Sequence, residues 1–236
     1  MDTLLLLGLG CLAGILTTVA GLGGGMLLVL AVTVLRDPVS ALAATTPALM
    51  LGNLHRLLLF RRDIVWRIVG PFSVGALPGA IVGALFAVAI PPRFVLGTMT
   101  ALTVLALLKA WRGWQWRFGA RFLMPVGFGI GALTGTAGGA GLLMGPVFLS
   151  AGLSGVSYSA STALAASLMH AGRLMGYGSG GLLNRAVLSD ACWLACAIFA
   201  GNLVGRRLRV ALDERGAHVL EYATLVACVA LALAGY

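Results

Sequence analysis

Two glycine clusters, Gly-Gly-Gly at 23–25 and Gly-Gly-Ala-Gly at 138–141, each precede a short apolar stretch. Glycine lowers helix stability and frees the local backbone. A helix that begins directly after such a break presents unpaired N–H groups and a partial positive charge, which together bind anions. The glycines that we expect to contact an anion are Gly23, Gly24, Gly25, Gly138, Gly139 and Gly141.

Hydroxyl side chains follow each short stretch at corresponding places, as Thr45 and Thr46 in the first case and Ser161 and Thr162 in the second. Such hydroxyls can complete a polar binding site. They can equally bond to carbonyl groups of their own helix or cap its first turn. The sequence leaves both interpretations open.

Asn53 and His170 lie inside apolar segments, where a polar side chain is costly unless it has a partner. His170 could donate to an anion or carry a proton, since histidine titrates near neutral pH. A hydrogen bond between helices is the alternative. Arg173, like Arg56, lies about one turn from the end of its segment, where it could attract the substrate or extend to the interface.

The chain has 236 residues, of which 60% are hydrophobic and 10% charged, and its mean hydropathy is +1.01. A soluble domain of this size has too little polar surface for such a composition. The net charge of +9 comes from short clusters between apolar runs, which indicates membrane topology and no nucleic acid partner. All seven carboxylates lie at or near the edges of these runs, which makes a buried carboxylate relay improbable. The cysteine spacing fits no metal site, and we expect no cofactor.

Apolar stretches long enough to cross a bilayer recur along the whole chain, which predicts an all-α polytopic membrane protein. The first stretch lacks a positive leader and a small-residue cleavage site, so we expect it to be retained. The predicted crossing helices span residues 4–20, 41–60, 66–90, 94–110, 122–135, 158–177, 186–205 and 217–236, and the two short stretches span 26–35 and 142–151.

A shift of 115 residues aligns the first glycine cluster with the second, and a shift of 117 then aligns Thr45 with Thr162. The same shift pairs Asn53 with His170 and Arg56 with Arg173. The chain therefore reads as two repeats, residues 1–110 and 122–236. A polar linker at 111–121 joins them.

Arginine and lysine gather at residues 61–67, 109–121 and 206–215, which predicts that these segments are cytoplasmic and that both termini are outside. The repeats then run in opposite directions through the membrane. Each repeat has a glycine-broken helix pair followed by three crossing helices. Carriers built from inverted repeats bind substrate near the midplane and alternate access between the two sides.

With these features, the chain resembles the TauE/SafE family of bacterial membrane proteins, the sulfite exporter and toluenesulfonate uptake permease group. The resemblance rests on the glycine break, the Leu-Leu pair and the Thr-Thr or Ser-Thr helix, at 21–46 and again at 135–162. It implies transport of small sulfur-containing anions, such as sulfite or organosulfonates, across the inner membrane. The second cluster departs from an uninterrupted glycine triplet, and Pro47 follows Thr46 where an ordinary helix residue is usual.

The sequence thus predicts a secondary carrier, not an enzyme, whose partners are a small anion and the lipid bilayer. A homodimer is plausible, and the coupling ion is open. One alternative is an anion channel. Another is a rhomboid-like intramembrane protease, because Gly-Leu-Ser-Gly at 152–155 matches the serine motif of that class and His170 or His218 could serve as the base.

Overall fold

The computed structural model describes residues 3–19, 23–112, 119–211 and 214–235. Within these ranges the chain forms ten α-helices and no strand, so the all-α prediction is confirmed. Residues 20–22 and most of the predicted linker, 113–118, lie outside the described residues. The helices are α1 (Thr3–Val19), α2 (Gly24–Leu35), α3 (Pro38–Phe60), α4 (Trp66–Ala89), α5 (Pro92–Arg112), α6 (Leu123–Ala137), α7 (Ala140–Ser150), α8 (Gly155–Ser179), α9 (Arg185–Ala211) and α10 (Glu214–Ala234).

The helix α3 begins three residues earlier than the apolar pattern predicts, because its first turn is capped. The Asp37 carboxylate accepts hydrogen bonds from the backbone N–H groups of Val39 and Ser40, at 3.1 and 2.9 Å. Pro38 occupies the first helical position, where its missing N–H costs nothing. This cap fixes the end of α3 opposite to the end where the charged residues Arg61 and Arg62 follow.

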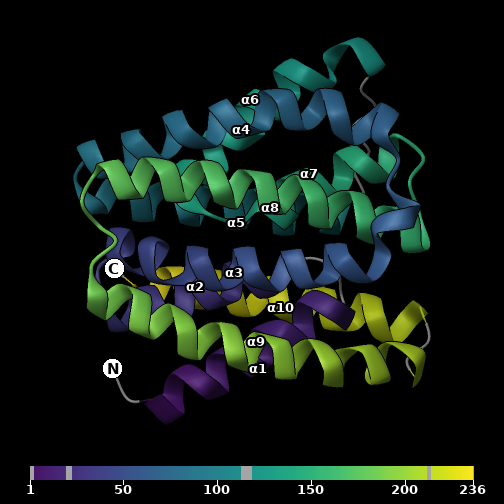
Figure 1. Cartoon of the computed structure of the whole chain (residues 1–236). Coiled ribbons are helices and arrows are strands. Elements are labelled where there is room, and N and C mark those ends of the chain that lie inside the picture. The colour runs from purple at the N-terminus through teal and green to yellow at the C-terminus, as the bar shows by residue number, and fades with distance from the viewer. Residues whose placement is uncertain (1–2, 20–22, 113–118, 212–213, 236) are drawn as a thin grey trace.

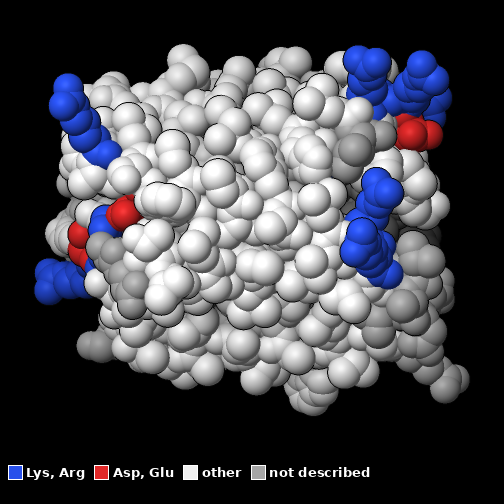
Figure 2. All heavy atoms as spheres, turned by 60° about the horizontal axis from the view of Figure 1, so that its bottom comes forward, with Lys and Arg blue, Asp and Glu red and all other residues white. Residues whose placement is uncertain are grey.

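A broad uncharged band separates charged residues at the two ends of the molecule (Figure 2). Among the described residues, α4, α5 and residues 185–208 of α9 are long and apolar enough to cross a membrane by themselves. At 24 residues, α4 is about 36 Å long, which exceeds the roughly 30 Å hydrocarbon core of a bilayer. The architecture is that of a polytopic membrane protein.

The two central helices, α3 and α8, pack against each other and carry most of the predicted site residues. They are less apolar than α4, α5 and α9 and are not among the helices that could cross a membrane by themselves. Their polar side chains, among them Thr45, Ser161 and Arg173, are buried within the protein. Surrounding helices shield these side chains from lipid, as expected for polar groups at membrane depth.

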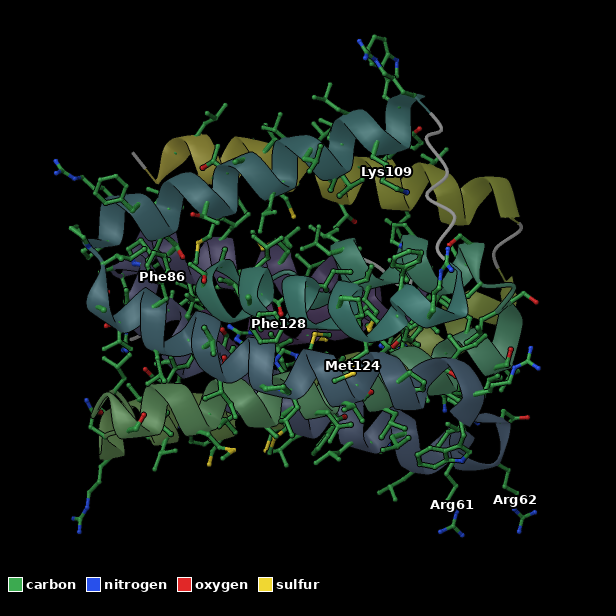
Figure 3. The ribbon with its side chains drawn as sticks, turned by 90° about the horizontal axis from the view of Figure 1, so that it is seen from above. Arg61, Arg62, Phe86, Lys109, Met124 and Phe128 are labelled. Carbon is green, nitrogen blue, oxygen red and sulfur yellow. The ribbon has the colours of Figure 1, made fainter. Side chains whose placement is uncertain are left out.

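The helix pairs show an internal correspondence. If each of α1–α5 is replaced by the helix at the same place in α6–α10, and the reverse, most of the packed pairs are reproduced. Helix α4 packs against α6 as α9 packs against α1, and α4 packs against α8 as α9 packs against α3. Both termini lie at one end of the molecule (Figure 1), whereas Arg61 and Arg62 lie at the other end and Lys109 lies in the half of the molecule nearer to them (Figure 3). The first repeat therefore starts at one end and the second at the opposite end, as the predicted inverted repeats require.

Glycines spaced four residues apart bring α4 and α6 into backbone contact. A Cβ atom at Gly79 would collide with the carbonyl oxygen of Phe128, and one at Gly131 with that of Ala76. Small residues at this spacing allow membrane helices to approach closely. The corresponding pair α1 and α9 is joined in the same way, because a Cβ atom at Gly14 would collide with the carbonyl oxygen of Ile198. Each close pair joins one helix from each repeat.

Candidate functional site

Both glycine breaks contain backbone conformations that favour glycine. The φ angles are +87° at Gly23, +79° at Gly138 and +73° at Gly139, a region that residues with side chains rarely adopt. In α2 the Leu27 N–H donates to the Gly23 carbonyl at 2.8 Å. The N–H groups that precede such a first bond have no acceptor in their own helix.

The N-termini of α2 and α7 lie beside each other in the interior. A Cβ atom at Gly139 would be 3.1 Å from the sulfur atom of Met26, and one at Gly23 would be 3.9 Å from a methyl group of Leu142. Two helix N-termini thus meet in one place, where their dipoles favour negative charge.

A cavity with a volume of about 60 Å³ lies where the two N-termini meet. A single water needs roughly 10–15 Å³ on the same measure, so the cavity has room for a small ion. The predicted site residues in its wall are Gly23, Gly25, Asn53, Gly139, Gly141, Thr162 and His170. The others are Thr17, Met26, Leu49, Arg56, Leu142, Met144 and Ala166.

The remaining predicted residues lie outside this wall: Gly24, Thr45, Thr46, Gly138, Ser161 and Arg173. The hydroxyl groups of Thr45 and Thr46 donate to carbonyl oxygens of α3 itself, at 2.8 and 2.6 Å. The Ser161 hydroxyl accepts from the Val65 N–H at 3.2 Å, which ties α8 to the start of α4. The hydroxyl protons of both threonines are thus used within the protein fold.

Gly24 and Gly138 lie against neighbouring helices. A Cβ atom at Gly24 would be 2.6 Å from the carbonyl oxygen of Ala13 in α1. One at Gly138 would be 3.3 Å from a methyl group of Leu42 and 3.6 Å from one of Val29. In this structure, side chains of the first repeat therefore cover the second glycine break on the side away from the cavity.

Arg56 lies in the cavity wall and is 8% exposed. Its guanidinium donates to the Asn53 side-chain oxygen at 3.4 Å, and the Asn53 amide donates to the Leu49 carbonyl at 2.8 Å. Across the described residues no carboxylate pairs with this guanidinium. The sequence contained a signal for Arg56, its alignment with Arg173, but did not place it among the ligands.

Arg173 is fully buried and does not extend to the interface. One guanidinium nitrogen lies 3.1 Å from His170 Nδ1, and the guanidinium carbon lies 5.6 Å from the centre of the Tyr177 ring. Its Nε and second terminal nitrogen have no hydrogen-bond partner within the described structure. Since arginine only donates, His170 Nδ1 accepts, and neutral His170 then carries its hydrogen on Nε2.

A second, smaller cavity adjoins the first and shares Arg56 and Asn53 with it. Its wall includes Asn202 of α9, whose side-chain oxygen accepts from the Thr18 hydroxyl at 2.9 Å. The amide nitrogen of Asn202 has no partner among the described residues. Sequence reasoning missed Asn202, although an asparagine inside an apolar segment is the same signal that singled out Asn53.

The serine motif at 152–155 is separated from its proposed base. Ser154 precedes α8 and is exposed, and its carbonyl accepts from the Ser157 hydroxyl at 2.8 Å. His170 lies sixteen residues further along, about 24 Å at 1.5 Å per residue. The side chain of His218 lies outside the described residues. Ser154 and His170 therefore form no nucleophile and base pair.

Among the described residues, no three His, Cys, Asp or Glu side chains are placed to hold a metal ion. The fold and cavity define a polytopic α-helical membrane protein with a small cavity between its two glycine breaks. Residues 6–235 match the family described as Sulfite exporter TauE/SafE, so the chain belongs to that family of membrane transporters. Comparisons with curated proteins and with solved structures find no match.

Proposed function

We propose that the chain is a secondary carrier for a small anion, a sulfur oxyanion or organosulfonate, which it moves by alternating access at the cavity between the glycine breaks. We also propose that it acts in the bacterial inner membrane, with the end that carries Arg61 and Arg62 in the cytoplasm. The positive-inside pattern supports this orientation.

The observation that supports anion binding best is the buried guanidinium of Arg56. It lines the cavity, and within the described part of the chain no carboxylate neutralises it. An unpaired charge at membrane depth costs several kcal/mol, and a bound anion would remove this cost. A cation carrier would require an aspartate or glutamate at its binding site. None of the residues in the cavity wall is either.

The other polar groups at the cavity are also mainly donors. The first turns of α2 and α7, which contain N–H groups without an acceptor in their own helix, line the space, and the His170 Nε2 hydrogen is available when the ring is neutral. The Thr162 hydroxyl donates to the Tyr158 carbonyl at 2.8 Å, so it contributes less. A cavity with several donors and few acceptors selects for negative charge.

Family membership and cavity size together support a sulfur oxyanion. The cavity volume of about 60 Å³ holds only a few water molecules. It therefore favours a compact ion such as sulfite over a bulky aromatic sulfonate.

The helix pairing supports alternating access. Backbone contacts join α1 to α9 and α4 to α6, and α3 packs on α9 as α8 packs on α4. Two bodies follow, α1–α3–α9 and α4–α6–α8, which meet where α3 contacts α8. Relative motion of these bodies would open the site to one side and then to the other.

The test is uptake into proteoliposomes across a panel of sulfite, thiosulfate, sulfoacetate, taurine and carboxylates. We expect saturable uptake of at least one sulfur anion. The Arg56→Gln variant should bind it about 10- to 100-fold more weakly, because hydrogen bonds to charged groups contribute about 1.5–3 kcal/mol. Arg62→Gln is the matched control, since it removes the same charge from an exposed position at the same end.

An unlabelled anion inside the proteoliposomes should accelerate uptake of the labelled anion. This acceleration is expected of a carrier and not of a channel. Uptake of cations without anions would contradict the charge selectivity. Wild-type uptake by Arg56→Gln would contradict the assignment of the site.

A further inference from the structure

The cavity is displaced toward one end of the pseudo-symmetric site, since its wall includes Arg56 but not the corresponding Arg173. Its wall on α3 consists of residues in the second half of that helix, up to Arg56, and its wall on α8 ends at His170. It extends toward the end of the molecule that carries Arg61 and Arg62. Arg173, which corresponds to Arg56, lies beyond the cavity and is fully buried.

The predicted residues outside the cavity wall mostly correspond to residues within it. Gly24 aligns with Gly139, and Gly138 aligns with Gly23. One member of each pair is in the wall and the other is covered.

The same relation holds for the polar side chains. Thr45 aligns with Thr162, and Arg173 aligns with Arg56. The two arginines have corresponding contacts, since each donates to the residue three positions earlier on its helix, Asn53 at 3.4 Å or His170 at 3.1 Å. Asn53 and His170, which also align, both line the cavity, whereas each of these other pairs contributes only one member.

We infer that Arg173, together with Gly138 and Thr45, forms the anion-binding wall of the opposite-facing state, in place of Arg56, Gly23 and Thr162. This inference rests on the proposed alternating access. The ligand is the same small oxyanion, which would pass from one guanidinium to the other. Val29 and Leu42, which cover Gly138 here, must move away.

The unsatisfied hydrogen-bonding capacity of Arg173 supports the inference. Two of its nitrogens have no partner in the described structure, although a buried donor without a partner is costly. A purely structural arginine in this place would be expected to bond to carbonyl oxygens. The free donors are those that a bound oxyanion would satisfy in the other state.

Opening of the side that is closed in this structure does not require α8 to separate from α4. A Cβ atom at Gly172 would be 2.7 Å from the Leu77 carbonyl oxygen, and one at Gly176 would be 2.5 Å from the Ala84 side chain. These contacts keep α8 on α4, as the corresponding packing of α3 on α9 coexists with the present cavity. Access to Arg173 would therefore open on the other side of α8, toward α2 and α3.

The first test uses wild-type protein in proteoliposomes and methylglyoxal, a small reagent that modifies exposed arginine. Peptide mass mapping should find Arg173 modified, although it is fully buried in this structure. Arg93, which is exposed, is the internal standard. Absence of modification at Arg173 after Arg93 has reacted fully, in protein that exchanges sulfite during the same period, would overturn the inference.

The second test separates binding from transport, with radiolabelled sulfite as the probe. Arg173→Gln should bind sulfite in detergent within about 2-fold of wild type but exchange it at least about 10-fold more slowly, since it loses a charged contact in one state only. Arg173→Lys should retain part of the exchange. Wild-type exchange by Arg173→Gln would overturn the inference, and loss of binding equal to that of Arg56→Gln would assign both arginines to one state.

The two proposals fail differently. If wild-type protein transports no anion, the proposed function fails, whereas methylglyoxal still reports whether Arg173 becomes exposed. If Arg173→Gln does not fold, the labelling of the unmodified protein decides. Thermal unfolding in detergent identifies that case.

Discussion

Replacement of Gly25 by alanine tests whether backbone N–H groups bind the anion. Gly25 lines the cavity in the first turn of α2, and its φ angle is outside the positive region that favours glycine. A Cβ atom there would lie 3.5 and 3.7 Å from the two methyl groups of Leu49, which is ordinary van der Waals contact. The side chain therefore fits without strain.

The expected effects on stability and on binding have opposite directions. Alanine is favoured over glycine in helices by up to about 1 kcal/mol, so Gly25→Ala should be as stable as wild type or more stable. Its methyl group occupies the space beside the first N–H groups of α2. Loss of one hydrogen bond to a charged ligand costs about 1.5–3 kcal/mol, which corresponds to about 10- to 100-fold weaker sulfite binding.

The neighbouring variant Gly24→Ala is a matched control, for which we expect the opposite effect on stability. Its Cβ atom would lie 2.6 Å from the Ala13 carbonyl oxygen and 2.7 Å from the Thr17 nitrogen, and would collide with the Thr17 hydroxyl. Overpacking of this kind costs about 1–3 kcal/mol. Gly24→Ala should therefore unfold at lower temperature.

The assays are thermal unfolding in detergent and equilibrium binding of radiolabelled sulfite, on the same preparations. If Gly25→Ala binds sulfite as wild type does while remaining folded, the helix N-terminus is not a ligand. If Gly24→Ala is as stable as wild type, the close packing of α2 on α1 is not as described.

Three further outcomes are expected. Gly131→Ala should lower stability by about 1–3 kcal/mol because its Cβ atom meets a carbonyl oxygen of α4, whereas Gly129→Ala, with no atom within 4 Å, should not; unfolding temperatures compare them. Asp190→Asn should change the free energy of unfolding by less than about 1 kcal/mol, because the 2.6 Å ion pair of Asp190 with Arg36 is partly exposed. A larger decrease, measured by denaturant unfolding, would contradict this expectation. Tyr177→Phe should cost about 1–3 kcal/mol, since its hydroxyl donates to a buried carbonyl of α6 at 2.6 Å, and a neutral effect on unfolding would argue against that bond.

The helices and their interruptions follow directly from the sequence, because apolar length and glycine clusters are local properties. The predicted span at 66–90 corresponds to Trp66–Ala89, and the short stretch at 26–35 lies within Gly24–Leu35. Larger differences occur at the end of α9, which continues to Ala211 where the predicted span ends at 205, and at the start of α3, Pro38. There the cap and not the apolar pattern sets the boundary.

The close contacts between helices at glycine could have been predicted from the spacing of the glycines in the sequence. Glycines at 75, 79 and 83 in α4 and at 127, 131 and 135 in α6 repeat every fourth residue, which is typical of closely packed membrane helices. The spacing predicts a close contact for each helix but not its partner. That α6 pairs with α4, and α1 with α9, depends on the tertiary arrangement.

Hydroxyl groups show the limit of reasoning from residue types. Thr45 and Thr162 occupy corresponding positions, and both donate to carbonyl oxygens four residues earlier in their own helices. Only Thr162 lies in the cavity wall. A sequence gives the type and level of a side chain in a helix, but the direction in which a cavity opens is a property of one conformational state.

The division of the predicted site into lining and covered residues follows from this distinction. Two inverted repeats with nearly the same motif must encode two related surfaces, and an asymmetric conformation can expose only one of them at a time. On the proposed alternating access, a list of site residues derived from the motif combines residues of both states. Arg56 and Arg173 align between the two repeats and make comparable bonds to the polar residue three positions earlier, but only Arg56 reaches the cavity. On the same proposal, their different exposure reflects how far the two bodies have moved toward one side, and a structure of the opposite state should reverse it.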